Sequence, residues 1–183
     1  MIEIIDNIIS VEEQNHIKNL LLNRSFPWFY LNDVSFENNT LERKPGLSHY
    51  FIKEGKISSD WLMKQPNNIS KLIDSSANFL KKEELKIIKS RAFLQFPLSE
   101  EMIKGNYIDT PHLDLKEKHI ELLYYVNDSD GDTIIYEDVK KNKIKKTIKP
   151  KQGRMVIFDG LYWHTGSQPR NNIRCIINTD ITK

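Results

Sequence analysis

The fold class is decided by Ile120-Glu121-Leu122-Leu123-Tyr124-Tyr125-Val126, a run rich in β-forming side chains. The cluster Asn127-Asp128-Ser129-Asp130-Gly131 follows it and has the composition of a turn. Four similar runs lie nearby, separated by further turn residues: Thr133–Tyr136, Ile144–Ile148, Met155–Phe158 and Ile173–Thr179. Short strands at this spacing are typical of a β-sandwich or jelly roll. The sequence therefore predicts a mainly β fold in its C-terminal half.

Helical patterns are confined to the N-terminal half. Ser10 and Glu13 have the spacing of a capping box, which predicts a helix from Val11 to about Asn23. A second helix is predicted where apolar residues recur at helical spacing, at Ile69, Leu72, Ile73, Ala77 and Leu80. The pattern from Lys86 to Phe96 is extended and ends at Pro97, and no helix is predicted beyond it. The helices are expected to flank the jelly roll on its outside.

Length and composition favour one globular domain. The chain has 183 residues, of which 39% are hydrophobic and 28% charged, a balance that excludes a disordered chain. We expect a single domain over residues 1–183, with helical or irregular support in 1–85 and a jelly-roll core from about 86 to 181.

Several features bear on location. The lone Cys175 cannot form an internal disulfide, which is compatible with a reducing compartment. The longest apolar run, Leu122 to Val126, is far shorter than the roughly 20 residues that a spanning helix needs. Glu3 and Asp6 stand where a secretion signal would be basic. We therefore predict a cytoplasmic protein without a membrane partner.

The most conspicuous charge run is the lysine-rich stretch from Lys140 to Lys151. It suits contact with phosphate or with an acidic partner. It also follows the acidic residues Asp128 to Asp138, and the formal net charge of the whole chain is only +2. We therefore favour a solvated hairpin that balances its acidic neighbours and protects a sheet edge, and nucleic acid is not an expected partner.

One pattern suggests a metal site. His112-Leu113-Asp114 places an imidazole and a carboxylate two residues apart, so in extended chain both project to the same side. His164 lies near the end of the predicted sandwich, after the run Met155–Phe158. Two histidines and one carboxylate can form a facial triad that leaves three iron positions open. The alternative is that His112 and His164 are ordinary loop histidines and Asp114 a turn residue.

Strand alternation indicates an anion site. Arg174, Ile176 and Asn178 share one face of the last run, and Cys175 and Ile177 share the other. If Cys175 and Ile177 pack against the helices, Arg174 points into the barrel, where its buried charge requires a carboxylate. Tyr125 shares a face with Glu121 and Leu123 and is a candidate hydroxyl donor. The alternatives are a surface cation for Arg174 and a core aromatic for Tyr125.

Four further residues lie close to these candidates in sequence. His119 is expected to be a core group or to support a ligand rather than to be one. Arg91 and Gln95 are candidates for lining the cavity, although the phase of their strand is left open. Arg170 is expected to be exposed to solvent.

Taken together, these motifs resemble those of the iron(II)/2-oxoglutarate-dependent dioxygenases, in the prolyl-4-hydroxylase-like branch. The resemblance spans about residues 91 to 180 and rests on His112-Leu113-Asp114, Leu122–Asn127, Gly131-Asp132-Thr133, Pro150–Phe158, His164 and Arg174. The first 90 residues resemble, more faintly, those of small phage and marine-bacterial members. The resemblance implies a double-stranded β-helix with iron held by His112, Asp114 and His164. It also implies that Arg174 binds 2-oxoglutarate, with Tyr125 assisting, and no catalytic residue beyond the metal ligands is predicted.

Two details of the resemblance refine the expected reaction. Halogenases of this family replace the acidic ligand by a small residue, so the intact Asp114 favours hydroxylation. Arg174 lies ten residues after His164, which is similar to prolyl hydroxylases rather than to the nucleic-acid demethylases. Where the family often has two glycines before a Glu-Thr pair, this chain has Gly131-Asp132-Thr133.

The hypothesis is an oxidoreductase that uses Fe(II), 2-oxoglutarate and O2 to hydroxylate a C–H bond of a prolyl peptide, an amino acid or another small substrate. Two alternatives remain open at this point. One is a jelly-roll module that binds an anion through Arg174 without turnover, and the other is a nucleic-acid demethylase whose Lys140–Lys151 hairpin contacts the backbone.

Overall fold

The computed structural model describes residues 1–34, 44–63, 69–80, 85–138, 140 and 143–182. Its elements are, in chain order, β1 (Ile2–Ile5), α1 (Val11–Leu21), β2 (Phe29–Leu31), β3 (Gly46–Lys53), β4 (Lys56–Ile57), the 3-10 helix η1 (Asp60–Met63), α2 (Ile69–Phe79), β5 (Lys86–Gln95), α3 (Glu100–Ile103), β6 (Ile120–Tyr125), β7 (Thr133–Tyr136), β8 (Ile144–Ile148), β9 (Met155–Asp159), β10 (His164–Gly166) and β11 (Arg174–Thr182). The predicted mainly β class with flanking helices is confirmed.

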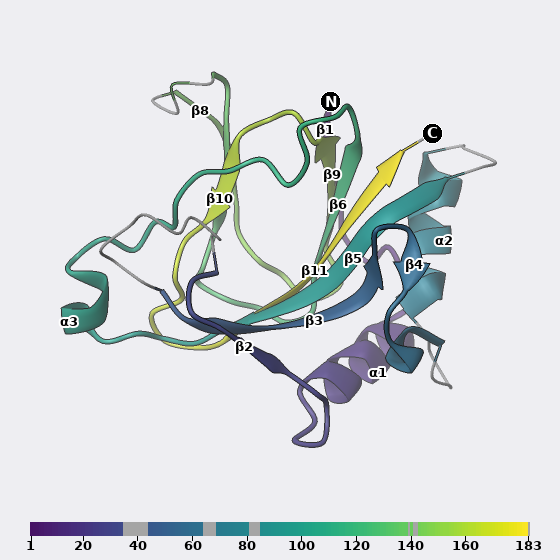
Figure 1. Ribbon diagram of the computed structural model, residues 1–183, viewed down its shortest axis with the longest axis horizontal. Helices are drawn as coiled ribbons and strands as arrows, with labels where there is room; N and C mark the ends of the chain where they lie inside the picture. The colour runs from purple at the N-terminus through teal and green to yellow at the C-terminus, as the bar shows by residue number, and fades with distance from the viewer. Residues whose placement is uncertain (35–43, 64–68, 81–84, 139, 141–142, 183) are drawn as a thin grey trace.

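The strands form two antiparallel sheets. The larger has eight strands in the order β1-β9-β6-β11-β5-β3-β2, with β4 paired to β3, and the smaller has the order β10-β7-β8. Figure 1 shows the small sheet standing apart from α1 and α2, which lie together beyond the other side of the large sheet. The large sheet is thus covered by helices on one face and by the small sheet on the other.

The central strands of the large sheet alternate between two cores. We call the layer between the large sheet and the helices the outer core, and the layer between the two sheets the inner core. The outer core contains Leu122, Tyr124, Cys175, Ile177, Ile17, Leu21 and Leu72, and the inner core contains Leu123, Tyr125, Ile176, Phe93, Ile135 and Ile148. Because successive side chains of a strand point to opposite faces, one strand serves both cores.

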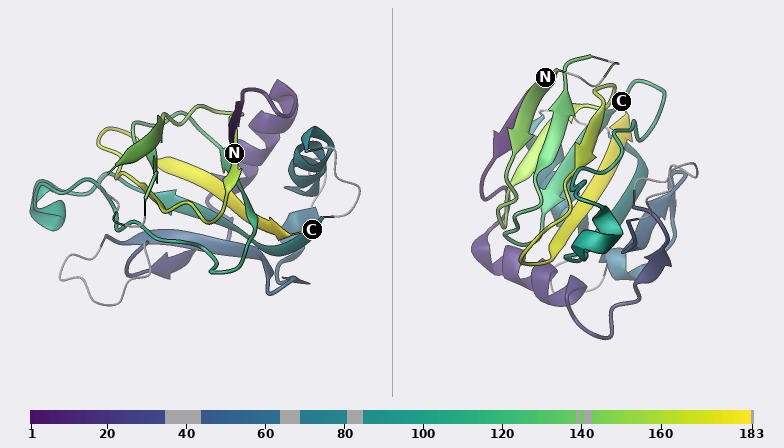
Figure 2. Two further views of the ribbon diagram at one scale, coloured as in Figure 1. Left: turned by 90° about the horizontal axis from the view of Figure 1, so that it is seen from above. Right: turned by 90° about the vertical axis from the view of Figure 1, so that its left-hand side faces the viewer.

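The two predicted helices are present and bury the expected faces. The Ser10 hydroxyl accepts a bond from the Glu13 amide at 3.3 Å, and the Glu13 carboxylate accepts one from the Ser10 amide at 3.0 Å, which completes the capping box. Helix α1 ends at Leu21, two residues before the predicted Asn23. Figure 2 shows α1 and α2 side by side along the large sheet.

The first 85 residues supply more of the sheet than their pattern indicated. Strand β1 pairs with β9, and β3 pairs with β5 along most of its length. In the second half of the chain, two short elements, α3 and β10, were not predicted. Helix α3 is a single turn capped by Ser99, and β10, with the polar sequence His-Thr-Gly, is a strand because its backbone pairs with β7.

The lysine-rich stretch forms the edge of the small sheet. Strand β8 is its outer strand, and most of its side chains are exposed. Lys143 and Lys145 both form ion pairs with Glu137, which directly follows the neighbouring strand β7. This is expected for a hairpin whose charges balance one another. Lys141 lies outside the described residues. Charged side chains on an edge strand oppose pairing with other chains.

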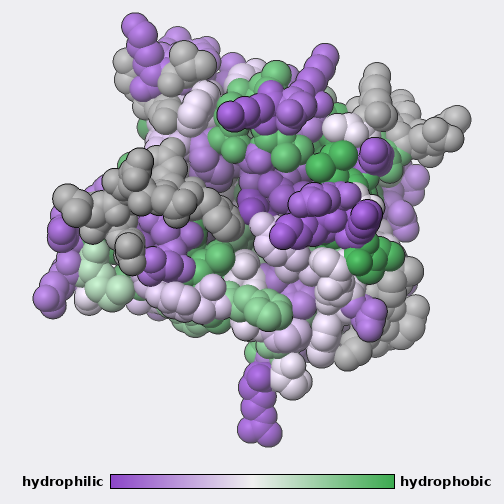
Figure 3. All heavy atoms as spheres, viewed as in Figure 1, coloured by the Kyte–Doolittle hydropathy of each residue, from purple (hydrophilic) through white to green (hydrophobic). Residues whose placement is uncertain are grey.

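The surface in the view of Figure 3 is largely polar, with hydrophobic residues in small separate groups. Among the helices that the structure describes, none has both the length and the apolar character needed to cross a bilayer.

We expect Ser10→Ala to lower the free energy of unfolding by about 1 kcal/mol, because the Glu13 amide loses its capping acceptor. Urea unfolding followed by circular dichroism measures this. Val11→Ala is the matched control, since Val11 is exposed at the first turn of the same helix. Equal stability of the Ser10 variant and the wild type would show that the cap contributes nothing.

Candidate metal centre and adjoining cavity

The inner face of the large sheet is built in rows by the pairing of β11 with β5 and β6. On that face Arg174 lies opposite Gln95, Ile176 lies opposite Phe93 and Tyr125, Asn178 lies opposite Arg91 and Leu123, and Asp180 lies opposite Lys89 and Glu121. The face therefore begins with a buried cation, continues through apolar side chains and ends in a group of ionisable ones.

His112 and His164 are far apart in sequence but are joined by their backbones. They form an isolated antiparallel bridge, in which the His112 amide donates to the His164 carbonyl at 2.9 Å and the His164 amide donates back at 3.1 Å. The ring centroids lie 4.8 Å apart. The bridge thus holds the two imidazoles beside one another through backbone hydrogen bonds.

Each imidazole is held by its Nδ1 atom. Nδ1 of His112 lies 3.0 Å from the Thr110 carbonyl, and Nδ1 of His164 lies 3.1 Å from the Tyr162 carbonyl. A carbonyl only accepts, so Nδ1 of each ring carries a proton and Nε2 is the nitrogen left to bind a metal. Burial and the neighbouring His164 lower the pKa of His112 to about 4, which keeps its ring neutral.

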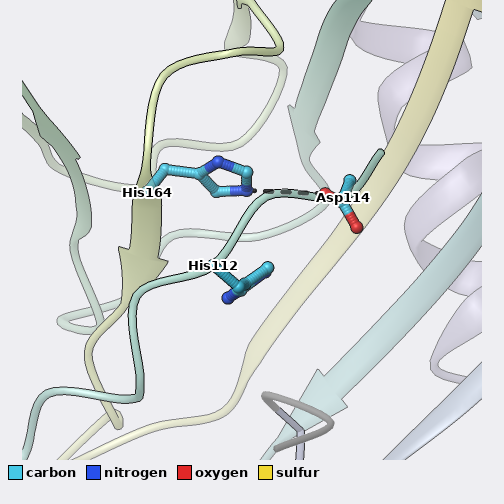
Figure 4. Close-up of side chains that lie close together, drawn as sticks. All are labelled: His112, Asp114 and His164. Atoms are coloured by element: carbon cyan, nitrogen blue, oxygen red, sulfur yellow. Dashed lines mark ion pairs between the residues drawn. The ribbon is translucent and has the colours of Figure 1, made fainter. Parts of the chain in front are cut away.

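Asp114 completes the group. Its Oδ2 atom lies 3.4 Å from Nε2 of His164, and Figure 4 shows these two side chains facing each other with His112 beside them. Burial opposes ionisation of Asp114, but the charges of Arg91, His164 and Lys89 hold its pKa well below the usual range. The side chain is therefore a carboxylate although it is only 2% exposed.

The structure thus brings together all three residues of the triad predicted from the sequence. Their potential ligand atoms lie within 4.8 Å of one another. Two imidazoles and one carboxylate are a donor set that suits divalent first-row metals, Fe(II) included, and the backbone acceptors on Nδ1 are the outer support usual for histidine ligands. By donor chemistry and orientation, these residues fit such an ion.

Arg174 is buried, as strand alternation predicted. Its Nε donates to the Gly131 carbonyl at 2.9 Å, one terminal nitrogen to Gln95 at 2.7 Å and the other to Thr133 at 2.9 Å. A guanidinium has five N–H groups, so one N–H on each terminal nitrogen remains for a ligand. No carboxylate among the described residues forms an ion pair with Arg174, although the group is only 4% exposed.

A cavity connects this arginine with the histidines. It is lined by Val34, Arg91, Phe93, Gln95, Asp109, His112, Leu123, Thr133, His164, Thr165, Gly166, Arg174, Ile176 and Asn178. Arg91 and Gln95, which the sequence analysis considered as cavity residues, both line it. Its middle is apolar, and its two ends carry the guanidinium and the two imidazoles.

Tyr125 faces the inner core, as its strand phase predicted, but it is not among the residues that line the cavity. Its hydroxyl donates to Thr133 Oγ1 at 2.7 Å, and the same atom accepts from Arg174. Burial raises the pKa of Tyr125 to about 12, so the hydroxyl keeps its proton. In this structure Tyr125 orients the partner of the arginine.

Two other residues that the sequence analysis considered differ in exposure. His119 is buried and Arg170 is exposed. Arg170 stacks on Tyr107 at 3.8 Å from the ring centroid. Cys175 lies in the outer core, away from the cavity.

Sequence reasoning missed Asp109. This carboxylate is 4% exposed and accepts bonds from Gln95 at 2.9 Å and Gln168 at 2.6 Å, with Lys44 at 3.7 Å. Burial raises the pKa of Asp109 while these partners act in the opposite direction. No motif marks it, because its partners come from distant parts of the chain.

Sequence reasoning also assigned no role to Lys89, Asn178 and Asp180. Lys89 pairs with Asp114 at 2.9 Å and with Asp180 at 2.7 Å, and Asn178 donates to Asp114 at 2.9 Å. The strand alternation that places Arg174 on the inner face places Asn178 and Asp180 there too, so the sequence pattern already indicated their direction. Lys89 required the register of β5, which the pattern left open.

No protein-family model matches the chain, and no curated protein matches it either. Solved structures do. A 2OG-Fe(II) oxygenase family protein from Burkholderia pseudomallei has a TM-score of 0.71 at 10% identity, covering 99% of this chain and 84% of its own.

Two prolyl hydroxylases are also similar. The viral collagen prolyl hydroxylase of Paramecium bursaria Chlorella virus-1, solved with 2OG, has a TM-score of 0.60 at 14% identity, covering 98% of this chain and 94% of its own. A Trichoplax adhaerens prolyl hydroxylase was solved with a hypoxia inducible factor peptide fragment. It has a TM-score of 0.63 at 16% identity, covering 98% of this chain and 82% of its own. The fold that the sequence motifs implied is thus confirmed, and the chain shares the jelly-roll fold of solved 2OG-Fe(II) oxygenases, prolyl hydroxylases among them.

Proposed function

We propose that the protein is an Fe(II)- and 2-oxoglutarate-dependent dioxygenase that hydroxylates a C–H bond. The observation that carries the proposal is the cavity with a His-His-carboxylate group at one end and an arginine without an ion-pair partner among the described residues at the other. A buried guanidinium is costly unless it meets an anion, and its two remaining N–H groups suit a carboxylate. The fold of the similar structures agrees with this assignment.

In this proposal His112, Asp114 and His164 hold Fe(II). Arg174 binds the distal carboxylate of 2-oxoglutarate, and Thr133 and Gln95 hold the guanidinium in place. The bound iron, with 2-oxoglutarate and O2, supplies the oxidising chemistry that no side chain offers. Succinate and CO2 are the expected co-products.

The chain itself contributes orientation and exclusion of water. The Thr110 and Tyr162 carbonyls fix the two imidazoles, and Arg91 and Lys89 keep Asp114 ionised. Leu123, Ile176 and Phe93 surround the middle of the cavity with apolar surface. Charged contacts at both ends become stronger where water is excluded.

The substrate is proposed to be a peptide, an amino acid or another small molecule. A surface groove of about 360 Å³ is lined by Tyr50, Lys53, Glu54, Ile88, Lys89, Arg91, His112, Leu113, Asp114 and Leu115. It shares His112 and Arg91 with the cavity, so a C–H bond placed there lies next to the proposed iron. The similar Trichoplax protein was solved with a peptide, which supports a peptide as one candidate.

We expect Asp114→Asn to weaken Fe(II) binding by at least about tenfold and to abolish succinate formation, because it removes the anionic ligand while keeping the shape of the side chain. Equilibrium dialysis and a succinate assay measure the two effects. Asp132→Asn is the matched control, since Asp132 is half-buried and belongs to no described ligand group. Unchanged iron affinity in the Asp114 variant would remove this residue from the site.

We expect Arg174→Gln to raise the 2-oxoglutarate concentration needed for half-maximal activity by at least about tenfold, since it removes a buried ionic partner. Arg170→Gln is the control, because Arg170 is exposed and stacked on Tyr107. A thermal shift by 2-oxoglutarate that requires a divalent metal should also vanish in the Arg174 variant only. Binding without any product from the wild type would favour the module without turnover.

A further inference from the structure

Three buried side chains next to the candidate metal centre form a second cluster. His119 is 3% exposed, and Glu121 and Asp180 are both fully buried. Their potential ligand atoms lie within 4.8 Å of one another. None of the three belongs to the His112–Asp114–His164 group.

The backbone brings these residues together. Glu121 on β6 and Asp180 on β11 are directly paired across the sheet, and His119 immediately precedes β6. The His119 ring fits against Gly160, where a Cβ atom would lie only 2.0 Å from its Nε2. The cluster therefore depends on a close approach that only glycine permits.

The orientation of His119 leaves a lone pair inside the cluster. Its Nδ1 lies 2.7 Å from the Glu117 carbonyl, so Nδ1 carries the proton and Nε2 is the acceptor. Nε2 lies 3.9 Å from Oδ1 of Asp180, and no described residue gives it a hydrogen bond. A buried acceptor without a donor is unfavourable.

Each carboxylate is likewise only partly satisfied. Glu121 accepts a bond from Asn178 at 2.6 Å through Oε1, and Asp180 meets Lys89 at 2.7 Å through Oδ2. Oε2 of Glu121 and Oδ1 of Asp180 have no hydrogen-bond donor among the described residues. Each of the three buried residues thus has an acceptor atom without a described donor, and a cation bound among them could satisfy these atoms together.

We propose that His119, Glu121 and Asp180 form a second divalent-cation site, distinct from the one in the proposed function. One imidazole nitrogen and two carboxylates suit first-row ions such as Mn²⁺, Fe²⁺ or Zn²⁺. The two sites are adjacent, since Asn178 donates both to Glu121 and to Asp114, and Oε1 of Glu121 lies 3.4 Å from Nε2 of His164.

Protons are the competitor for this cation. Burial and the charges of Asp114 and Asp180 raise the pKa of Glu121 well above its usual range. Without a cation, a proton shared between the carboxyl groups of Glu121 and Asp180 would be the other way to relieve their repulsion. A direct count of bound metal separates the two states.

The test measures metal content of the full chain. Chelator-treated protein is dialysed against Mn²⁺ at neutral pH, and bound manganese is counted by mass spectrometry. We expect two ions in the wild type, one in His119→Gln and one in His112→Gln. His49→Gln is the matched control and should bind two, because His49 is equally buried but has both ring nitrogens bonded, to the Pro27 carbonyl and Ser59.

The outcomes distinguish the two sites. One ion in the wild type and in His119→Gln, with none in His112→Gln, overturns the second site and leaves the proposed function standing. One ion in the wild type and in His112→Gln, with none in His119→Gln, supports the second site and removes the first. Two ions in the wild type that remain two in His119→Gln, or fall to one in His49→Gln, also overturn the proposal.

A second variant keeps the test valid if His119→Gln does not fold. Glu121→Gln preserves the shape of the side chain and should lower the affinity of the second site for Mn²⁺ by at least about tenfold. Loss of a residue that only supports a ligand already costs about that much, and Glu121 is proposed as a ligand itself. In the His112→Gln background, Mn²⁺ should raise the melting temperature in a concentration-dependent way, and the added Glu121→Gln change should abolish that shift. A shift that survives it contradicts the second site.

Discussion

Strand β11 pairs with β5 along one side and with β6 along the other, and its alternation sends Arg174, Ile176, Asn178 and Asp180 to the inner face. The intervening residues, Cys175 and Ile177, pack in the outer core with the helices. A shift of register by one residue would place a guanidinium and a carboxylate among apolar side chains. The burial of both faces therefore fixes the register of this strand. That register places Arg174 and, through the pairing with β5, Arg91 on the inner face.

The charges at the far end of that face are mutually dependent. Asp114 is held by Arg91 and Lys89, and Lys89 also meets Asp180. A buried ion pair gains little net stability, but loss of one partner leaves the other uncompensated. This network is better explained by the need to keep Asp114 ionised and oriented than by stability.

Much of the site could be predicted because its signals are local. The His112-Leu113-Asp114 spacing, the position of Arg174 ten residues after His164, and the alternation of the last strand are all visible in one sequence. The bridge between His112 and His164 was not predictable, because it depends on backbone pairing across 52 residues. The parts that sequence reasoning missed likewise depend on register or on long-range contact. The inward direction of Lys89 follows from the pairing of β5 with β11, and Asp109 is surrounded by side chains from three other segments.

The order of side chains along the cavity bears on the shape of the cosubstrate proposed above. Arg174 at one end offers two N–H groups in a fork, and the histidines at the other end offer lone pairs that a metal ion can use. Between them, Leu123, Ile176 and Phe93 provide no hydrogen-bonding group. A ligand that satisfies all three regions has a carboxylate at one end, a short apolar middle and a metal-chelating group at the other.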